Sequence, residues 1–272
     1  MRKISTIVFS LWSISAVATG QQTSPSAPIE PASSDGLQPA PLVVAQPPQQ
    51  SGGIHWKSLL EQWWLNLTIE QTERIAQQVK TRDALSGPFF QNWFTSVTTY
   101  HFNRWDDDDK FLTSNLGHPT QGAVVYAIFW QNDDHVRFSD QDFHSAAYRK
   151  ALLQSFLFVT FDTVQYKLGP LSEASIGNVG LPAHWYETAA ACKQFNLSCE
   201  PRTGLNDLIL NETAGMVMTL GFQWLDKHVQ KRIEERYQSR AVIDVTRMLT
   251  YPPQAWANIL RFKRPWYRDN RP

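Results

Sequence analysis

The motif His118-Pro119-x-x-Gly122-x-x-x-Tyr126 decides the fold of this chain, because it places polar groups in an apolar, helix-like run. Two further runs of this kind carry the motifs Asp162-x-x-Gln165 and Asp207-x-x-x-Asn211-x-x-x-Gly215. An unpaired polar group in an apolar interior costs free energy and must find a partner. We therefore expect these three helices to face one another through their polar sides.

The spacing within each run determines which side chains share a helix face. Residues three or four positions apart lie on the same face, so Asp162 accompanies Gln165 and Asp207 accompanies Asn211. Gly215 lies on the same helix face as Asp207 and Asn211. Because it has no side chain, it allows another helix to approach closely at this face. If the three helices are neighbours, one polar pocket is lined by His118, Asp162, Gln165, Asp207 and Asn211.

Three interpretations of this pocket remain open. A divalent metal would suit His118, Asp162 and Asp207, because imidazole and carboxylate groups are common metal ligands. The same residues suit acid/base catalysis, in which a carboxylate tunes the histidine near neutral pH. The third interpretation, which we favour, is a buried hydrogen-bond network without chemistry. No spacing here matches a specific signature such as His-Glu-x-x-His.

A loop rich in small residues follows the second polar run, at residues 168–180. Glu173 in this loop either completes the polar pocket or accepts hydrogen bonds from backbone N–H groups. The alternative is a plain turn whose glycines permit positive φ. The candidate binding residues of the pocket and loop are Gln165, Glu173, Asn178, Asn211 and Tyr126.

The chain divides into three segments. Residues 1–20 have the basic start, apolar stretch and small residues of a secretory signal peptide, with cleavage expected before Gln21. Residues 21–53, rich in Pro, Gln and Ser, cannot bury enough apolar area to fold, which indicates a disordered linker. Residues 54–272 form the helical domain. We expect secretion across the inner membrane to the periplasm or envelope, where Cys192 and Cys199 would form a disulfide.

The domain is predicted to be all-α, a bundle of about six helices, because no alternating run is long enough to build a sheet. Thr68 would open the second helix through a capping box. Pro88 would begin a third helix that presents Phe90 and Phe94 to the core. No run offers the ~20 mainly apolar residues that a membrane span needs. The expected helices cover residues 54–67, 68–82, 88 onward, 119–130, from a cap at 139–142 to 166, and 205–224.

Charge excludes one class of partner and suggests another. The 25 basic and 25 acidic residues cancel, so there is no whole-protein electrostatic argument for nucleic acid. Residues 226–272, however, hold eleven Lys or Arg against five Asp or Glu. The stretch from Arg261 to Arg268 mixes cations with aromatic rings, which is typical of a membrane surface. It also fits a tail whose rings pack on the helices, which we favour because the stretch lacks helical periodicity.

These motifs together resemble an uncharacterised bacterial envelope family marked by Asn-x-x-His-Pro-x-x-Gly-x-x-x-Tyr, here starting at Asn115. The resemblance runs from about Trp105 to the C-terminus and includes the 169–178 loop and the tail at 265–268. The order of polar motifs is more distantly similar to VanZ-like and YfiM-like helical envelope proteins. Asp162 stands where that pattern usually has Glu. The resemblance implies a helical fold and an envelope location, and it implies no settled activity.

Three functions follow as expectations. The first is a non-catalytic envelope protein whose polar cluster is structural. The second is a hydrolase of envelope lipid or glycan, either metal-dependent or acid/base, with His118, Asp162 and Asp207 as its catalytic residues; a divalent metal is the one cofactor the residues suggest. The third is an adaptor that binds a membrane surface or another envelope component through the Arg261–Arg268 tail.

Overall fold

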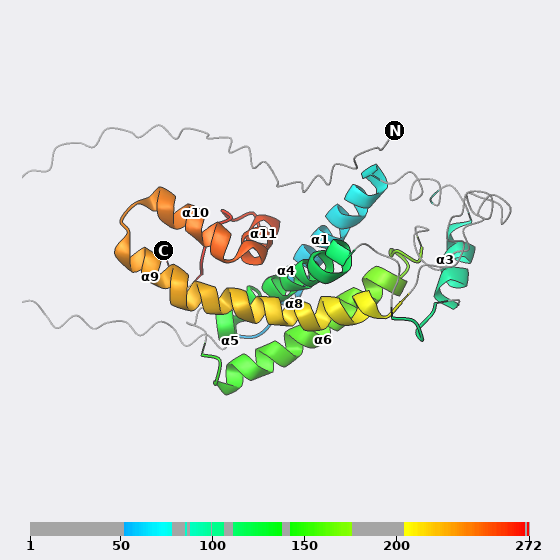
Figure 1. Ribbon diagram of the computed structural model, residues 1–272, viewed down its shortest axis with the longest axis horizontal. Helices are drawn as coiled ribbons and strands as arrows, with labels where there is room; N and C mark the ends of the chain where they lie inside the picture. The colour runs from blue at the N-terminus through cyan, green and yellow to red at the C-terminus, as the bar shows by residue number, and fades with distance from the viewer. Residues whose placement is uncertain are drawn as a thin grey trace, which may run out of the picture. The chain divides into compact units, whose positions relative to one another are not determined.

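The computed structural model describes residues 52–77, 85, 88–98, 100–105, 111–137, 142–175, 204–269 and 271. All of them belong to one unit, Gln49–Pro272. Within these ranges the regular elements are helices, as Figure 1 shows. The β-type pairing in the described residues is limited to two isolated bridges, Ile54 with Asp133 and Arg268 with Arg271. The all-α prediction is therefore confirmed. The predicted signal peptide, Asn178, Cys192 and Cys199 lie outside the described residues, as does nearly all of the predicted linker.

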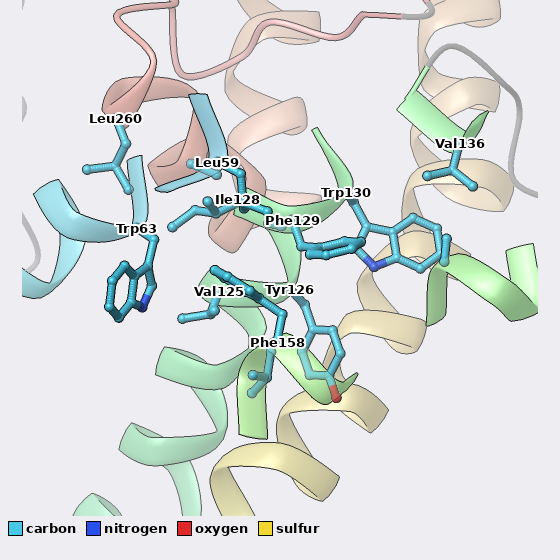
Figure 2. Packing of buried hydrophobic residues seen from close by; sticks show 14 of the residues in the cluster. Leu59, Trp63, Val125, Tyr126, Ile128, Phe129, Trp130, Val136, Phe158 and Leu260 are labelled. Carbon is cyan, nitrogen blue, oxygen red and sulfur yellow. The ribbon is translucent and has the colours of Figure 1, made fainter. Parts of the chain in front are cut away.

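Helix α4 (His118–Trp130) lies at the centre of the core. Its residues from Val125 to Phe129 are fully buried, which is expected of a helix that is apolar on all sides (Figure 2). Each large apolar side chain buried in this way contributes roughly 1.5–3 kcal/mol. The helices that pack on α4 are α1 (Trp56–Gln77), α6 (Ala146–Leu168), α8 (Asn206–Leu225) and α11 (Pro252–Leu260).

The contact between α4 and α8 is the most extensive in the described chain. Two glycines meet in it: a Cβ atom on Gly215 would lie 3.1 Å from the Cα atom of Gly122. The prediction that Gly215 admits a neighbouring helix is therefore confirmed. This close approach brings the polar stripe of α8 against the beginning of α4.

The remaining helices extend this core along the chain. Helix α8 continues through a π-helical turn, η3, into α9, and two further helices complete the C-terminal part. Sequence reasoning missed these last two, although Pro252 at the first position of α11 is a recognised helix start. The additional bounds are α3 Phe89–Thr98, η1 Thr113–Gly117, α5 Asp134–Arg137, η3 Asp226–Gln230, α9 Lys231–Arg236 and α10 Arg240–Thr250.

The predicted boundary at Thr68 is wrong, because α1 runs through it without interruption. The Thr68 hydroxyl donates to the carbonyl oxygen of Trp64, four residues earlier, at 2.7 Å. This is the usual bond of a threonine inside a helix, where its side chain has no orphan N–H group to cap. Gln71, three residues later, would be the other half of a capping box, and its side chain makes no hydrogen bond to a described residue.

Two further helix predictions need correction. Helix α6 begins at Ala146, and Ser145 caps it by accepting from the backbone N–H of Tyr148 at 3.1 Å, so the predicted cap at 139–142 is wrong. Helix α3 does not present Phe90 and Phe94 to the core, since these side chains are 73% and 68% exposed. Periodicity identifies an apolar face but not the neighbour that covers it, and here the opposite face packs inward.

Candidate functional site

The polar sides of α4, α6 and α8 meet at one carboxylate, that of Asp207. The Nε2 atom of His118, the first residue of α4, lies 3.0 Å from Asp207 Oδ2. The Nζ atom of Lys167, near the end of α6, contacts the same oxygen. His118 is 7% exposed, Lys167 3% and Asp207 0%. The predicted convergence of three polar helices is therefore present, with a lysine at its centre.

The same lysine connects Asp207 to a second acid, Glu173. Lys167 Nζ donates to Glu173 Oε2 at 2.6 Å, and Arg74 of α1 contacts the other carboxylate oxygen. Arg74 also donates to the hydroxyl of Tyr166 at 2.9 Å. Two acids and three basic groups thus alternate through the interior. We call His118, Asp207, Lys167, Glu173 and Arg74 the charged network.

The basic members Lys167 and Arg74 were missed by sequence reasoning. A lysine in the last turn of a helix is ordinarily a solvent-facing residue that complements the helix dipole. No spacing in the sequence marked Lys167 as buried, because it follows Asp162 by five residues and Tyr166 by one, and neither interval returns to the same face of a helix. Its burial becomes clear only from the two acids that contact it from other parts of the chain.

Electrostatics keep Glu173 and Lys167 ionised despite their burial. Burial alone would raise the pKa of Glu173, but Arg74, Lys167 and His118 together lower it to about 2. Burial opposes the charge of Lys167 as well, yet Glu173 and Asp207 raise the pKa of this lysine above its ordinary value. The Glu173 carboxylate and the Lys167 ammonium are consequently both charged near neutral pH.

Asp162 belongs to a second polar group, beside the charged network. The indole N–H of Trp63 donates to Asp162 Oδ1 at 2.6 Å, while Oδ2 has no hydrogen bond to a described residue. Burial raises the pKa of Asp162 to about 7. Burial and the nearby charge of Asp162 raise the pKa of Glu70 to about 8. Glu70 accepts from Gln121 of α4 at 2.9 Å.

The other predicted binding residues divide between these polar groups and plain packing. Asn211 donates to the hydroxyl of Thr163 at 2.6 Å, which ties α8 to α6. The Tyr126 hydroxyl donates to the carbonyl oxygen of Glu212 at 3.2 Å, which ties α4 to α8. Figure 2 shows the Tyr126 ring within the apolar core. Gln165 folds over Gly169 at the end of α6, and no hydrogen bond of its side chain to the charged network occurs in the described structure.

The arrangement does not form the metal site considered from the sequence. The oxygen of Asp207 nearest to His118 already contacts the ammonium of Lys167, where a cation would sit. In the part of the chain that the structure describes, no three His, Cys, Asp or Glu side chains gather so that they could hold a metal ion. The arrangement of donors therefore fits an internal salt-bridge chain better than a cation site.

Comparison of the chain with models of protein families, with curated proteins and with solved structures finds no match. Among the described helices, none combines the length and apolar character needed to cross a bilayer.

Proposed function

We propose that this chain is a non-catalytic helical protein of the bacterial cell envelope, in which the charged network serves as an internal scaffold. The observation that supports the scaffold role is the pairing of each acid. Asp207 lies against His118 and Lys167, and Glu173 lies against Lys167 and Arg74. A general acid or base must reach its substrate, whereas these side chains are buried.

The envelope location is supported by the sequence, through the signal-like residues 1–20 and the resemblance to envelope proteins. The test is mass spectrometry of the protein purified from a bacterial envelope fraction. We expect a mature N-terminus at Gln21 and a disulfide between Cys192 and Cys199. A full-length chain with both thiols reduced, recovered from the cytoplasmic fraction, would contradict the location and leave the scaffold role intact.

The scaffold role is tested by comparing two His–Asp pairs. His118→Gln removes the buried pair with Asp207, and His135→Gln removes a pair with Asp133 in which the histidine side chain is 51% exposed. We expect His118→Gln to lower the unfolding free energy more than His135→Gln. Neither change should alter bound metal or hydrolysis of envelope lipid or glycan substrates.

The opposite result would support the hydrolase. Stoichiometric metal or substrate turnover that disappears in His118→Gln, with the helical circular dichroism retained, contradicts a purely structural network. The same loss in His135→Gln would point to a general effect of removing a histidine, so the control separates the two cases.

A second candidate function, attachment to a membrane surface, is favoured by the turn after α11. Phe262 is 90% exposed and has a φ of 57°, a left-handed conformation that is unusual for a bulky residue. Exposed Lys263 and Arg264 follow it directly. An aromatic ring held outward beside two cations suits the interface of an anionic bilayer.

Hydrogen bonds of Asn258 hold the turn around Phe262 in this conformation. Asn258, fully buried, donates through its side chain to the carbonyl oxygens of Pro265 and Tyr267, both at 2.9 Å. Its own backbone carbonyl accepts from the backbone N–H of Lys263 at 2.9 Å. The predicted packing of the tail's rings is wrong for Phe262, and Tyr267 is still 37% exposed, while Trp266 is half-buried.

Sedimentation with vesicles of phosphatidylcholine and phosphatidylglycerol tests this candidate. We expect Phe262→Ala and Lys263→Gln each to weaken binding to the anionic vesicles several-fold. Phe90→Ala, which removes a ring 73% exposed on α3, is the matched control and should leave binding unchanged. Equal binding by all of these proteins, or no preference for the anionic vesicles, would rule out the turn as the attachment site.

A further inference from the structure

An apolar row runs along the outer side of α6. Its members, which are between 45% and 60% exposed, are Leu153, Leu157, Phe161 and Val164. Successive members are three or four residues apart, so they lie on one face of the helix. From Leu153 to Val164 the helix contains a single ionisable residue, Asp162, and its side chain is buried. The outer side of α6 is therefore apolar and uncharged over this length.

A second apolar row lies beside the first, on α1. Trp56, Leu60 and Trp64 follow one another at intervals of four residues and are between 44% and 54% exposed. The two rows join at Trp63, whose ring centre lies 5.4 Å from that of Phe161 and 6.2 Å from that of Trp64. We call the two rows together the α1–α6 face.

The α1–α6 face has the area that a specific protein interface needs. Each of its large apolar side chains is about half-exposed and leaves roughly 100 Å² open to solvent, so the face covers roughly 700 Å². The largest apolar patch on a typical monomeric protein covers about 300–600 Å². Two such faces in contact would bury roughly 1,400 Å², within the range of about 1,200–2,000 Å² for stable interfaces.

The α6 row is complementary to itself. When two copies of α6 lie antiparallel and are centred near residue 159, Leu157 of each copy meets Phe161 of the other. The same arrangement brings Leu153 against Val164. A two-fold axis pairs one surface with itself in this way, and spacings of three and four residues suit the seam between two helices. Exposed Lys150 would then lie across from Leu168, at the negative end of the other helix dipole.

The charge of the surrounding chain favours a protein over an anionic bilayer as the occupant. Residues 1–225 hold fourteen Lys or Arg against twenty Asp or Glu, so anionic lipid is not attracted to this part of the chain. We propose that the α1–α6 face binds a second copy of the chain, in a two-fold dimer whose α6 helices lie antiparallel. This assignment does not depend on the scaffold role of the charged network.

Sedimentation velocity of the full chain over a range of concentrations tests the proposal. We expect a dimer that dissociates on dilution. Leu157→Lys and Phe161→Glu should each weaken this dimer at least about tenfold, because each brings a charge from water into the apolar seam. Leu249→Lys is the matched control, since it adds a lysine at a leucine of α10 that is 72% exposed and lies outside the α1–α6 face. It should leave the dissociation constant unchanged.

Mixing the two weakened variants tests the antiparallel pairing. In a mixed dimer the introduced lysine of one copy faces the introduced glutamate of the other, while the symmetry-related contact keeps the natural Leu157 and Phe161. We expect the mixture to dimerise roughly tenfold more tightly than either variant alone. A mixture no tighter than the separate variants would overturn the pairing, and with it the proposed dimer.

Three further results would overturn the proposal. These are a monomer at every concentration, a dimer that neither α6 variant weakens, and an equal loss in Leu249→Lys. Flotation with phosphatidylcholine vesicles identifies the other occupant: a monomer that binds them, and that loses binding in Leu157→Lys, assigns the α1–α6 face to lipid instead. Circular dichroism checks the fold of each variant. If Phe161→Glu does not fold, Leu157→Lys and its control decide the question.

Discussion

Gly122 of α4 faces the backbone of Asn211 in α8 so closely that a Cβ atom on Gly122 would lie 2.0 Å from the Asn211 carbonyl oxygen. No real side chain tolerates that distance to a backbone atom. The two helices can therefore approach as they do only because position 122 is glycine. This approach also places Asp207, one turn before Asn211, within reach of His118.

Gly122→Ala should be strongly destabilising, because the helices must separate and the core between them must repack. We expect a loss of several kcal/mol, at the upper end of the overpacking range of about 1–3 kcal/mol or beyond it. Gly221→Ala is the control, since a Cβ atom there meets nothing within 4 Å. It should stabilise α8 by up to about 1 kcal/mol through helix propensity. Urea unfolding measures both, and equal effects would show that the close contact is unimportant.

Asp207→Asn should destabilise the protein by about 3–5 kcal/mol, because it neutralises one of the two acids that contact buried Lys167 in the described structure. Adding Lys167→Met should recover part of this loss, since the uncompensated charge is then removed. Glu61→Gln is the surface control: it breaks a pair with Lys57 whose side chains are 66% and 92% exposed. Such pairs contribute about 0–1 kcal/mol. A double-mutant cycle without coupling between Asp207 and Lys167 would refute the buried pair.

Asp162 should make the protein less stable as pH rises. Its pKa is about 7 in the folded chain against an ordinary 3.8, so the folded state keeps a proton that the unfolded state releases. The stabilising effect of this proton is complete below about pH 4 and is lost as pH rises towards 7, by an amount on the order of 4 kcal/mol. The pKa of Glu70 is raised from an ordinary 4.5 to about 8, so this residue extends the loss of stability to higher pH.

Asp162→Asn should reduce this slope. At pH 4 the variant and the natural protein should be similarly stable, because both carry a neutral side chain beside Trp63. At pH 8 the variant should be the more stable. Urea midpoints between pH 4 and pH 9 measure the slope. The opposite ordering at pH 8 would mean that Asp162 is ionised and well paired in the folded state.

Phe262→Gly should stabilise the isolated protein. The left-handed conformation costs a residue with a Cβ atom about 1–2 kcal/mol, and glycine is free of this cost. Phe262→Ala keeps the strain and should change stability little, because the ring is almost fully exposed. Thermal unfolding of the two variants provides the comparison. If glycine destabilises the turn, the ring makes a packing contribution that its exposure does not reveal.

The helical class and the polar stripes were predictable because each depends on spacing along the chain. His118, Asp207 and Asn211 were recognised as inward-facing since a polar residue in an apolar run needs a partner. The partners themselves were not predictable. Lys167 and Arg74 contact acids from other helices, and periodicity within one helix contains no information about a neighbour. The prediction grouped Asp162 with His118 because periodicity could not show which helix Asp162 faces. In the structure the hydrogen bond to Asp162 comes from Trp63.

The sequence by itself determined that this chain is helical, that its interior must hold polar groups, and that glycine permits a close helix contact. Only the tertiary structure decided which charges meet, which carboxylates keep their protons and which aromatic side chains stay exposed. The physical reason is that secondary structure follows from local periodicity. Ionisation and burial depend on atoms brought together from distant parts of the chain.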